Sequence, residues 1–543
     1  MKILKIVDKG IAFLEKGPVT IKTIFISFIA IVATRYLVEN ILFGFKTYDF
    51  AFLLGSMIQG TFLFFLMAYV AVLTFLILFI KEKPSKLATV LLWGQWIIVL
   101  PPIIDKIIFG EKDFWSFYIF DSIQGLFSRF FHFFGDNPSF GITYGTRVEI
   151  FLAMLGIGLY IGFKKRSWIK GLTGFLIMYI ILYFFAVFPS LLTFLIEGFL
   201  GEDIFKIKSS DIAATFLTSL EIFDFDKKSM KIALHFRASL FYTLFLFGNL
   251  LFLQFILNKN KFFALLRNVR YPQMFFNGGL FFVGLAMGCF YFPANISKDI
   301  FAIMTIVNLI ISISSAWFYS VLINDIEDTE IDKITNKERP LIRDVFTVSE
   351  YKNYAAVFMG LSLLTALVAG IKFFLIICVY LLATWVYSCR PMRLRRVLVI
   401  SSFISAAASM LFLFMGFIVV SNGQSLESFP WKIGVFLFIV YTLLIPIKDI
   451  KDIKGDKKNG VVTIPTLFGE DNSRFIFSVI IFISYLASIF ILNENKLWLS
   501  ATLFGALNYW ILNNKKIKTR NLNGWILGTV FVYGMLLVVI SFF

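Results

Sequence analysis

Residues Asn324 to Leu341 read N-D-I-E-D-T-E-I-D-K-I-T-N-K-E-R-P-L and directly follow an apolar stretch at 302–323. A second acidic segment, Lys448 to Pro465, reads K-D-I-K-D-I-K-G-D-K-K-N-G-V-V-T-I-P and follows the apolar stretch 432–447. Carboxylates at the edge of a membrane are costly and therefore mark candidate functional sites. The two segments predict helices that cross a membrane and carry a polar site at their ends.

The composition of the whole chain agrees with a membrane protein. Of its 543 residues, 59% are hydrophobic and only 16% are charged, and the mean hydropathy is +0.84. Repeated apolar stretches near 20 residues long predict an all-α polytopic membrane protein, and their continuity argues against a β-barrel. The net charge of +17 comes from Lys and Arg in short loops. Membrane topology explains this pattern, so we expect no nucleic-acid partner.

The apolar stretches predict two domains. A polar, basic break at 258–272 separates an N-terminal domain, 1–257, from a C-terminal domain, 258–543. Nine helices are expected in the second domain, near 273–292, 302–323, 354–370, 373–387, 397–420, 432–447, 475–492, 497–512 and 523–543. About six are expected in the first, near 23–45, 59–80, 87–108, 148–163, 171–197 and 232–257.

Two segments of the first domain fall outside these spans. The aromatic segment 114–134 fits an interfacial helix, a short span or a buried hairpin. The polar stretch 198–230 is interpreted as an external loop.

Basic residues in the connections predict the orientation. In the second domain, five alternating connections carry 23 Lys and Arg, and the four connections between them carry four. Cytoplasmic loops are enriched in Lys and Arg, so both acidic segments and the N-terminus are expected in the cytoplasm and the C-terminus on the opposite side. The expected location is the plasma membrane if the source is prokaryotic.

The spacing within each acidic segment suggests a shared face. If the preceding helix continues, Asn324, Asp328 and Asp332 recur every four residues and line up, with Asp325 beside them. Asp449, Asp452 and Asp456 follow a similar helical spacing, and Gly455 is expected to end or bend that helix.

Aligned carboxylates need a positive partner. Oxygen ligands without His or Cys favour a hard cation, with Mg²⁺ before Ca²⁺. The chain's three cysteines also lack metal-type spacing. Two such sites could hold one diphosphate between them. Four basic side chains from the same loops are expected to complete the site: Arg339, Arg390, Arg393 and Lys448.

The second domain resembles the UbiA superfamily of intramembrane prenyltransferases over about residues 265–543. The first segment is similar to the family's N-D-x-x-D-x-x-x-D motif, extended by N-x-x-R-P-L at Asn336, Arg339, Pro340 and Leu341. The second is similar to D-x-x-x-D at Asp452 and Asp456, followed by G-x-x-T-x-P at Gly460, Thr463 and Pro465. Further similarities lie at Tyr387, Ser388, Pro391, Arg393 and Leu394, at Arg395 where Lys is common, and at Arg270, Tyr271, Pro272 and Asn277.

The resemblance implies a nine-helix bundle and a Mg²⁺-dependent enzyme. Such an enzyme transfers an isoprenyl group from a prenyl diphosphate to an aromatic or hydroxyl acceptor, for lipid, quinone or related isoprenoid biosynthesis. It implies metal ligands at Asn324, Asp328, Asp452 and Asp456, with Asp325, Asp332 and Asp449 as supports or further ligands. It implies diphosphate contacts from Arg339, Arg390, Arg393 and Lys448, and stabilisation of an allylic cation by Tyr387.

Several alternatives remain open. Quinone-precursor rings, a tetrapyrrole carboxylate and a glycerol-phosphate lipid hydroxyl are candidate acceptors. A non-catalytic or transport-type membrane protein would use the acidic segments to bind a cation. A transferase of phosphorylated sugars is disfavoured, because a His-Pro segment is missing. For the first domain, an accessory membrane domain, a substrate-delivery or partner-binding module and a second enzyme are candidates. Its charges Glu39, Asp105 and Asp121 are interpreted as interfacial.

Overall fold

In the residues that it describes, the computed structural model consists of helices joined by turns and loops and contains no strand. The described residues are 2–17, 20–44, 53–110, 122–135, 142–217, 230–295, 299–421, 426–458 and 460–542. Contacts divide them into two units, unit 1 up to residue 253 and unit 2 from residue 254 onwards. The predicted domain boundary, after residue 257, coincides with the end of α12 (Met230–Leu257).

Unit 1 contains the predicted long helices of the first half. In the described chain thirteen helical segments are long and apolar enough to cross a membrane, and six of them belong to this half. Its elements are α1 (Lys2–Leu14), α2 (Ile21–Phe43), the π-helix η1 (Leu53–Phe62), α4 (Leu63–Ile80), α5 (Pro84–Gln95), η2 (Trp96–Val99), α6 (Leu100–Phe109), α7 (Ile123–Phe131), α8 (Tyr144–Lys164), α9 (Trp168–Ala186), α10 (Phe188–Phe199), α11 (Ser209–Leu217) and most of α12.

Three features of unit 1 refine the sequence-based expectation. The predicted span 171–197 is divided into α9 and α10, and Pro189, in the first turn of α10, explains the break, since it has no amide to continue α9. The aromatic segment contains α7, which at nine residues is too short to span a bilayer. The predicted external loop contains the short helix α11.

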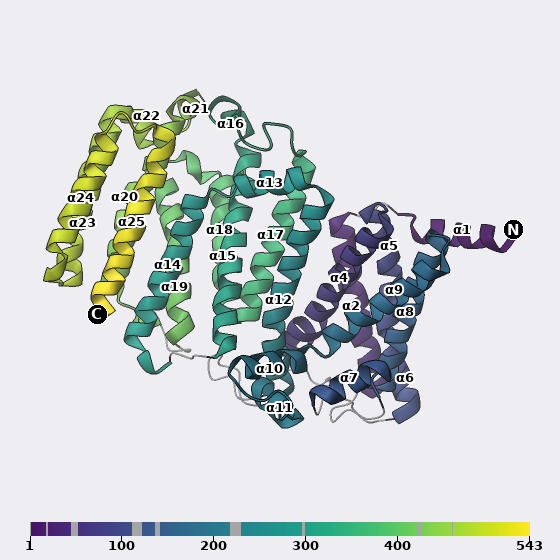
Figure 1. Cartoon of the computed structure of the whole chain (residues 1–543). Coiled ribbons are helices and arrows are strands. Elements are labelled where there is room, and N and C mark those ends of the chain that lie inside the picture. Colours follow the sequence, from purple (N-terminus) through teal and green to yellow (C-terminus); the bar gives the residue numbers. More distant parts are fainter. Residues whose placement is uncertain are drawn as a thin grey trace. The chain divides into compact units, whose positions relative to one another are not determined.

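Unit 2 contains all nine helices predicted for the second half. Its elements are α13 (Lys259–Arg267), α14 (Tyr271–Tyr291), η3 (Pro293–Asn295), α15 (Ile300–Glu327), α16 (Thr329–Thr335), α17 (Val348–Ala369), α18 (Ile371–Ser388), η4 (Leu394–Arg396), α19 (Ile400–Ser421), η5 (Leu426–Ser428), α20 (Trp431–Leu444), η6 (Ile445–Asp452), α21 (Ile453–Lys458), α22 (Ile464–Phe468), α23 (Glu470–Leu492), η7 (Asn495–Leu497), α24 (Trp498–Asn513) and α25 (Thr519–Phe542). The long helices run alongside one another, and α16, α21 and α22 gather at one end of the bundle (Figure 1). Both acidic segments therefore lie at the same end.

Glycines allow α14 and α19 to pack very closely. A Cβ on Gly284 would lie 1.9 Å from the carbonyl oxygen of Leu413, and one on Gly416 would lie 1.9 Å from that of Phe281. Small residues at such crossings let two helix backbones approach in a membrane, where apolar burial alone does not drive helices together. This contact fixes one wall of the bundle.

The turn before α14 brings polar groups to the acidic end. Arg270 has a left-handed backbone with φ +58°, and Pro272 starts α14 in the position where its missing amide costs nothing. The indole of Trp317 on α15 donates to the carbonyl of Val269 at 2.8 Å. The turn is thereby fixed against α15, with Asn268 and Arg270 near the first acidic segment.

Candidate active site

The first acidic segment is bent but keeps its helical spacing. α15 ends at Glu327, and Asp328 (φ −101°, ψ 12°) separates it from α16. The amides of Asp328, Asp332 and Asn336 still donate to the carbonyls four residues earlier, at 2.9, 2.8 and 2.9 Å. The side chain of Asn324 donates to Asp328 Oδ2 at 2.7 Å. Residues four apart therefore remain neighbours, although the helix does not continue unbroken.

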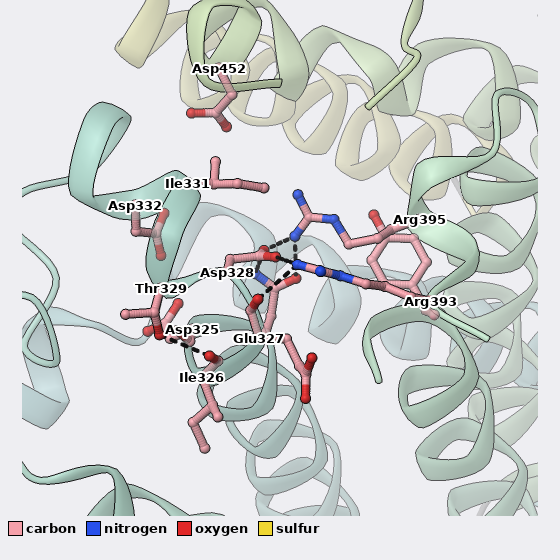
Figure 2. Close-up of polar contacts among 12 residues, drawn as sticks. Asp325, Ile326, Glu327, Asp328, Thr329, Ile331, Asp332, Arg393, Arg395 and Asp452 are labelled. Carbon is pink, nitrogen blue, oxygen red and sulfur yellow. Dashed lines mark hydrogen bonds and ion pairs between the residues drawn. The ribbon is translucent and has the colours of Figure 1, made fainter. Parts of the chain in front are cut away.

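Two arginines from η4 and the residue before it neutralise Asp328. Arg393 Nη2 lies 3.1 Å from Asp328 Oδ1 and donates to the carbonyl of Glu327 at 2.7 Å. Arg395 pairs with Asp328 Oδ2 and lies 3.4 Å from Asn324 Oδ1. Figure 2 shows both guanidinium groups converging on Asp328 from one side. Charged contacts to both oxygens, one from each arginine, hold this carboxylate in place.

Asp325 belongs to a separate, buried network. It is 1% exposed and pairs with Arg270 at 2.6 Å and with Arg339 at 3.6 Å. Asn268 donates to Asp325 Oδ2 at 2.6 Å and lies 3.0 Å from the hydroxyl of Tyr351. With both oxygens occupied by the protein, Asp325 is placed to hold the turn before α14 and the segment after α16 together.

Asp332 keeps one oxygen without a hydrogen bond. Its Oδ1 accepts from Asn336 at 2.8 Å. Its Oδ2 is buried and has no hydrogen-bond partner in the described chain, and Arg339 Nε is 3.9 Å away. Burial raises the pKa of Asp332 above its usual value, and nearby Arg339 opposes that rise. A buried carboxylate oxygen in this state is suited to an additional positive partner.

The second acidic segment reaches its geometry by a different helix type. η6 is a 3₁₀ helix with three residues per turn, so Asp449 and Asp452 lie one above the other. Asp456 follows one α-helical turn later, on α21. Gly455 does not end the helix, because α21 continues to Lys458.

Gly455 instead allows α16 and α21 to touch. A Cβ at Gly455 would lie 2.6 Å from Cγ2 of Thr335 and 3.2 Å from Cγ2 of Ile331. The side chain of Asn336 then contacts both acidic segments. Its Nδ2 lies 2.8 Å from Asp332 Oδ1 and 3.4 Å from Asp452 Oδ1. Figure 2 shows Asp452 across from Ile331 and Asp332. Segments more than a hundred residues apart thus form one site.

The predicted metal ligands are gathered, but they do not converge on one point. In the described chain no group of three or more His, Cys, Asp or Glu side chains is arranged to hold an ion. Asp328 is occupied by arginines, and Asp452 has Lys451 4.0 Å away. These side chains nevertheless offer only oxygen ligands, and Asp332 Oδ2 has no hydrogen-bond partner among the described residues. Both features fit a hard divalent cation.

The predicted basic and aromatic residues divide into two groups. Lys448 Nζ lies 3.3 Å from the hydroxyl of Tyr387 and 5.5 Å from the centre of its ring. Arg339 and Arg393 face the acidic side chains, as described above. Arg390 is exposed and contacts neither acidic segment in the described residues. Sequence spacing did not reveal the roles of Asn268 and Tyr351. For Arg395 the sequence shows only a similarity to the family, without a role.

An apolar cavity of about 1400 Å³ adjoins this polar site. Arg270, Asn324, Tyr387 and Lys448 contribute to its lining. The remaining walls come mainly from apolar side chains of α14, α19, α20, α23 and α25. The arrangement suits an amphiphile with a charged head and a long hydrocarbon tail.

Comparison with known proteins places this domain in a family. Residues 275–539 match the family model described as the UbiA prenyltransferase family. This part of the chain belongs to that family. No family model matches the N-terminal half.

Two curated relatives illustrate the range of the UbiA family. Digeranylgeranylglyceryl phosphate synthase of Sulfolobus acidocaldarius is 31% identical over 176 residues, which are 32% of this chain and 60% of that protein. The chloroplastic 2-acylphloroglucinol 4-prenyltransferase of Humulus lupulus is 26% identical over 190 residues, 33% of this chain and 45% of that protein. The chain therefore spans only between 45% and 60% of the length of these two relatives.

Solved structures of UbiA homologues also align with the chain. The homologue from Archaeoglobus fulgidus bound to DMAPP and Mg²⁺ is 20% identical, with a TM-score of 0.38 over 51% of this chain and 99% of that one. The apo homologue from Aeropyrum pernix K1 is 17% identical, with a TM-score of 0.39 over 49% of this chain and 98% of that one.

Proposed function

We propose that the domain at 258–543 transfers an isoprenyl group from a prenyl diphosphate to a lipophilic acceptor with a hydroxyl group or an aromatic ring. The observation that carries the proposal is the joining of two acidic segments through Asn336, beside a large apolar cavity. The match to the UbiA family supports the same reaction. Neither the geometry nor the family match identifies the acceptor, and the names of the two relatives above point to different acceptors.

The acidic segments are proposed to hold Mg²⁺. The ligands would be Asn324, Asp328, Asp332, Asp449, Asp452 and Asp456. Asp325 has a positioning role instead, because its contacts with Arg270, Arg339 and Asn268 join the turn before α14 to the segment after α16. When bound, Mg²⁺ supplies positive charge that stabilises a departing diphosphate.

The chain's own residues perform the remaining work. Lys448, Arg339 and the arginines at 393 and 395 are proposed to neutralise charge on the diphosphate, as guanidinium and ammonium groups do in phosphoryl sites. The hydroxyl of Tyr387 lies beside Lys448 at 3.3 Å. Its ring is proposed to stabilise the allylic cation. The apolar cavity would bind the prenyl tail and keep water from that cation.

The proposed orientation follows from the basic loops. Both acidic segments and the N-terminus would face the cytoplasm, and the C-terminus would lie on the opposite side. In a prokaryote the protein would reside in the plasma membrane. Soluble prenyl diphosphates would then reach the site from the cytoplasm.

Radiolabelled isoprenyl diphosphates and an acceptor panel test the proposal. Purified full-length protein is incubated with each donor and with glyceryl phosphate lipids, phenolic rings or a tetrapyrrole carboxylate. We expect a prenylated product from at least one acceptor, loss of product with EDTA, and at least a hundredfold loss in Asp452→Asn.

Glu330→Gln is the matched control for this variant. Glu330 belongs to the same site region, on α16, but its side chain is 76% exposed and pairs with Lys333. It should retain activity. Product formation that persists in EDTA and in Asp452→Asn would refute the metal-dependent mechanism. Cation movement across a vesicle without diphosphate release would instead indicate a transport protein.

A further inference from the structure

A second cavity lies within unit 1, and none of the residues assigned above to the candidate active site line it. Its volume is about 560 Å³, within the range of small-molecule sites. Residues of α1, α2, η1, α4, α5, η2, α8, α9, α10 and α12 line it. The residues that line it are largely apolar or aromatic, but several carry charge.

Three charged side chains line this cavity: Arg35 and Glu39, one turn apart on α2, and Glu149 on α8. No ion pair or hydrogen bond joins any of them to another side chain in the described chain. The buried Nε of Arg35 has no hydrogen-bond partner, and its guanidinium lies 5.5 Å from the centre of the Phe65 ring. Arg35 is two turns inside the end of α2, about 12 Å along the axis. Charges at such depth are expensive and mark functional sites.

A neutral group in the same lining is also left without a partner. Ser56 is 3% exposed, and its hydroxyl makes no hydrogen bond to any described residue. Its neighbours bond to one another, since the hydroxyl of Tyr36 is 2.5 Å from Thr61 Oγ1, and Thr61 donates to the Ser56 carbonyl at 3.1 Å. Buried polar groups are nearly always satisfied, so this hydroxyl is suited to a bound molecule.

Some other charged side chains of unit 1 have close partners. Glu15, whose side chain is 7% exposed, contacts Lys164 at 2.5 Å and Lys86 at 3.4 Å. Asp105 accepts a hydrogen bond from the amide of Gly145 at 2.8 Å. The charges that line the cavity have no such close partner, although Arg35 and Glu149 are near enough to interact electrostatically.

The signs of these charges restrict the chemistry of a ligand. A simple anion would satisfy Arg35 and leave both glutamates without a partner, and a simple cation would do the reverse. We propose that the cavity binds a zwitterionic group, with a phosphate or carboxylate on Arg35 and an ammonium between Glu39 and Glu149. Aromatic side chains in the lining, such as Trp93, provide a surface for the rest of the molecule. Free phosphoethanolamine and the headgroup of phosphatidylethanolamine share this chemistry.

Binding measurements on the full-length protein distinguish the two sources. The protein is reconstituted in nanodiscs of phosphatidylglycerol, which lacks an ammonium group. Free phosphoethanolamine is titrated by calorimetry, and retained phosphatidylethanolamine is counted by native mass spectrometry after its addition to the discs. We expect saturable binding in at least one arm and about tenfold weaker binding in Arg35→Gln and Glu149→Gln.

Two further variants keep the test decisive. Arg166→Gln removes a cation that is 81% exposed and should leave binding unchanged. Gly156 lines the cavity and has open space where a Cβ would be, so Gly156→Leu keeps every charge while reducing the available volume, and should weaken binding. Absence of binding in both arms would overturn the proposal. So would binding of inorganic phosphate as tight as that of phosphoethanolamine, or equal affinity in wild type and Arg35→Gln.

Discussion

Replacing Asp325 should mainly destabilise the protein, although its motif suggests a metal ligand. Its carboxylate is 1% exposed and faces Arg270 at 2.6 Å and Arg339 at 3.6 Å. Removing one partner from such a buried network leaves uncompensated charge and costs about 3–5 kcal/mol. Asp452 is 23% exposed with its nearest cation at 4.0 Å, so its removal should cost less than about 1 kcal/mol. Asp325→Ala should therefore lower stability more than activity, and Asp452→Ala should lower activity more than stability.

Denaturant unfolding of the two purified variants in detergent, followed by tryptophan fluorescence, measures the difference. A loss of 3 kcal/mol raises the unfolded-to-folded ratio about a hundredfold. Prenyl transfer is measured on the folded fraction, where Asp325→Ala should retain more turnover than Asp452→Ala. Equal unfolding midpoints for wild type and Asp325→Ala, together with loss of turnover, would refute the positioning role and favour direct ligation.

Three further outcomes follow from contacts described above. Gly416→Leu should lower the yield of folded protein in size-exclusion chromatography, because a Cβ there meets a backbone carbonyl at 1.9 Å, whereas Gly360→Leu, with nothing within 4 Å, should not. Burial would raise the pKa of Glu15, but hydrogen bonds from Lys164 and Tyr160 hold it below its usual value of 4.5. The stability from Glu15 should thus be present above about pH 4.5 and decline as the pH falls through its lower folded pKa; thermal unfolding of Glu15→Gln should lack this decline. EDTA should leave the thermal stability of unit 1 unchanged, as measured by limited proteolysis, and a selective loss there would contradict a metal confined to the acidic segments.

The long helices were predictable because each needs a continuous apolar stretch, which the sequence displays directly. The bend at Asp328 and the 3₁₀ form of η6 were not, since both depend on packing between segments that are distant in sequence. Spacing also grouped Asp325 with Asp328, which lie three residues apart, although the two side chains have different partners. Only the fold reveals that one faces Arg270 and the other Arg393.

In the N-terminal half, too, the sequence alone did not predict which groups contact each charged side chain. In the sequence Glu39 and Asp105 are isolated charges, and an interfacial position was the simplest interpretation. The structure places Glu39 in the lining of a cavity with Arg35, and gives Asp105 a backbone amide as partner. Local composition does not show on which side of a helix a residue lies, or which helices pack against that side.

The contact at Gly455 has a consequence for protein engineering. α16 and α21 touch there, and the amide of Asn336 is shared between their carboxylates. Grafting either segment alone from a homologue would pair surfaces that were never selected together, and a side chain in place of the glycine would push them apart. Chimaeras between relatives should therefore exchange 324–341 and 448–465 as one cassette.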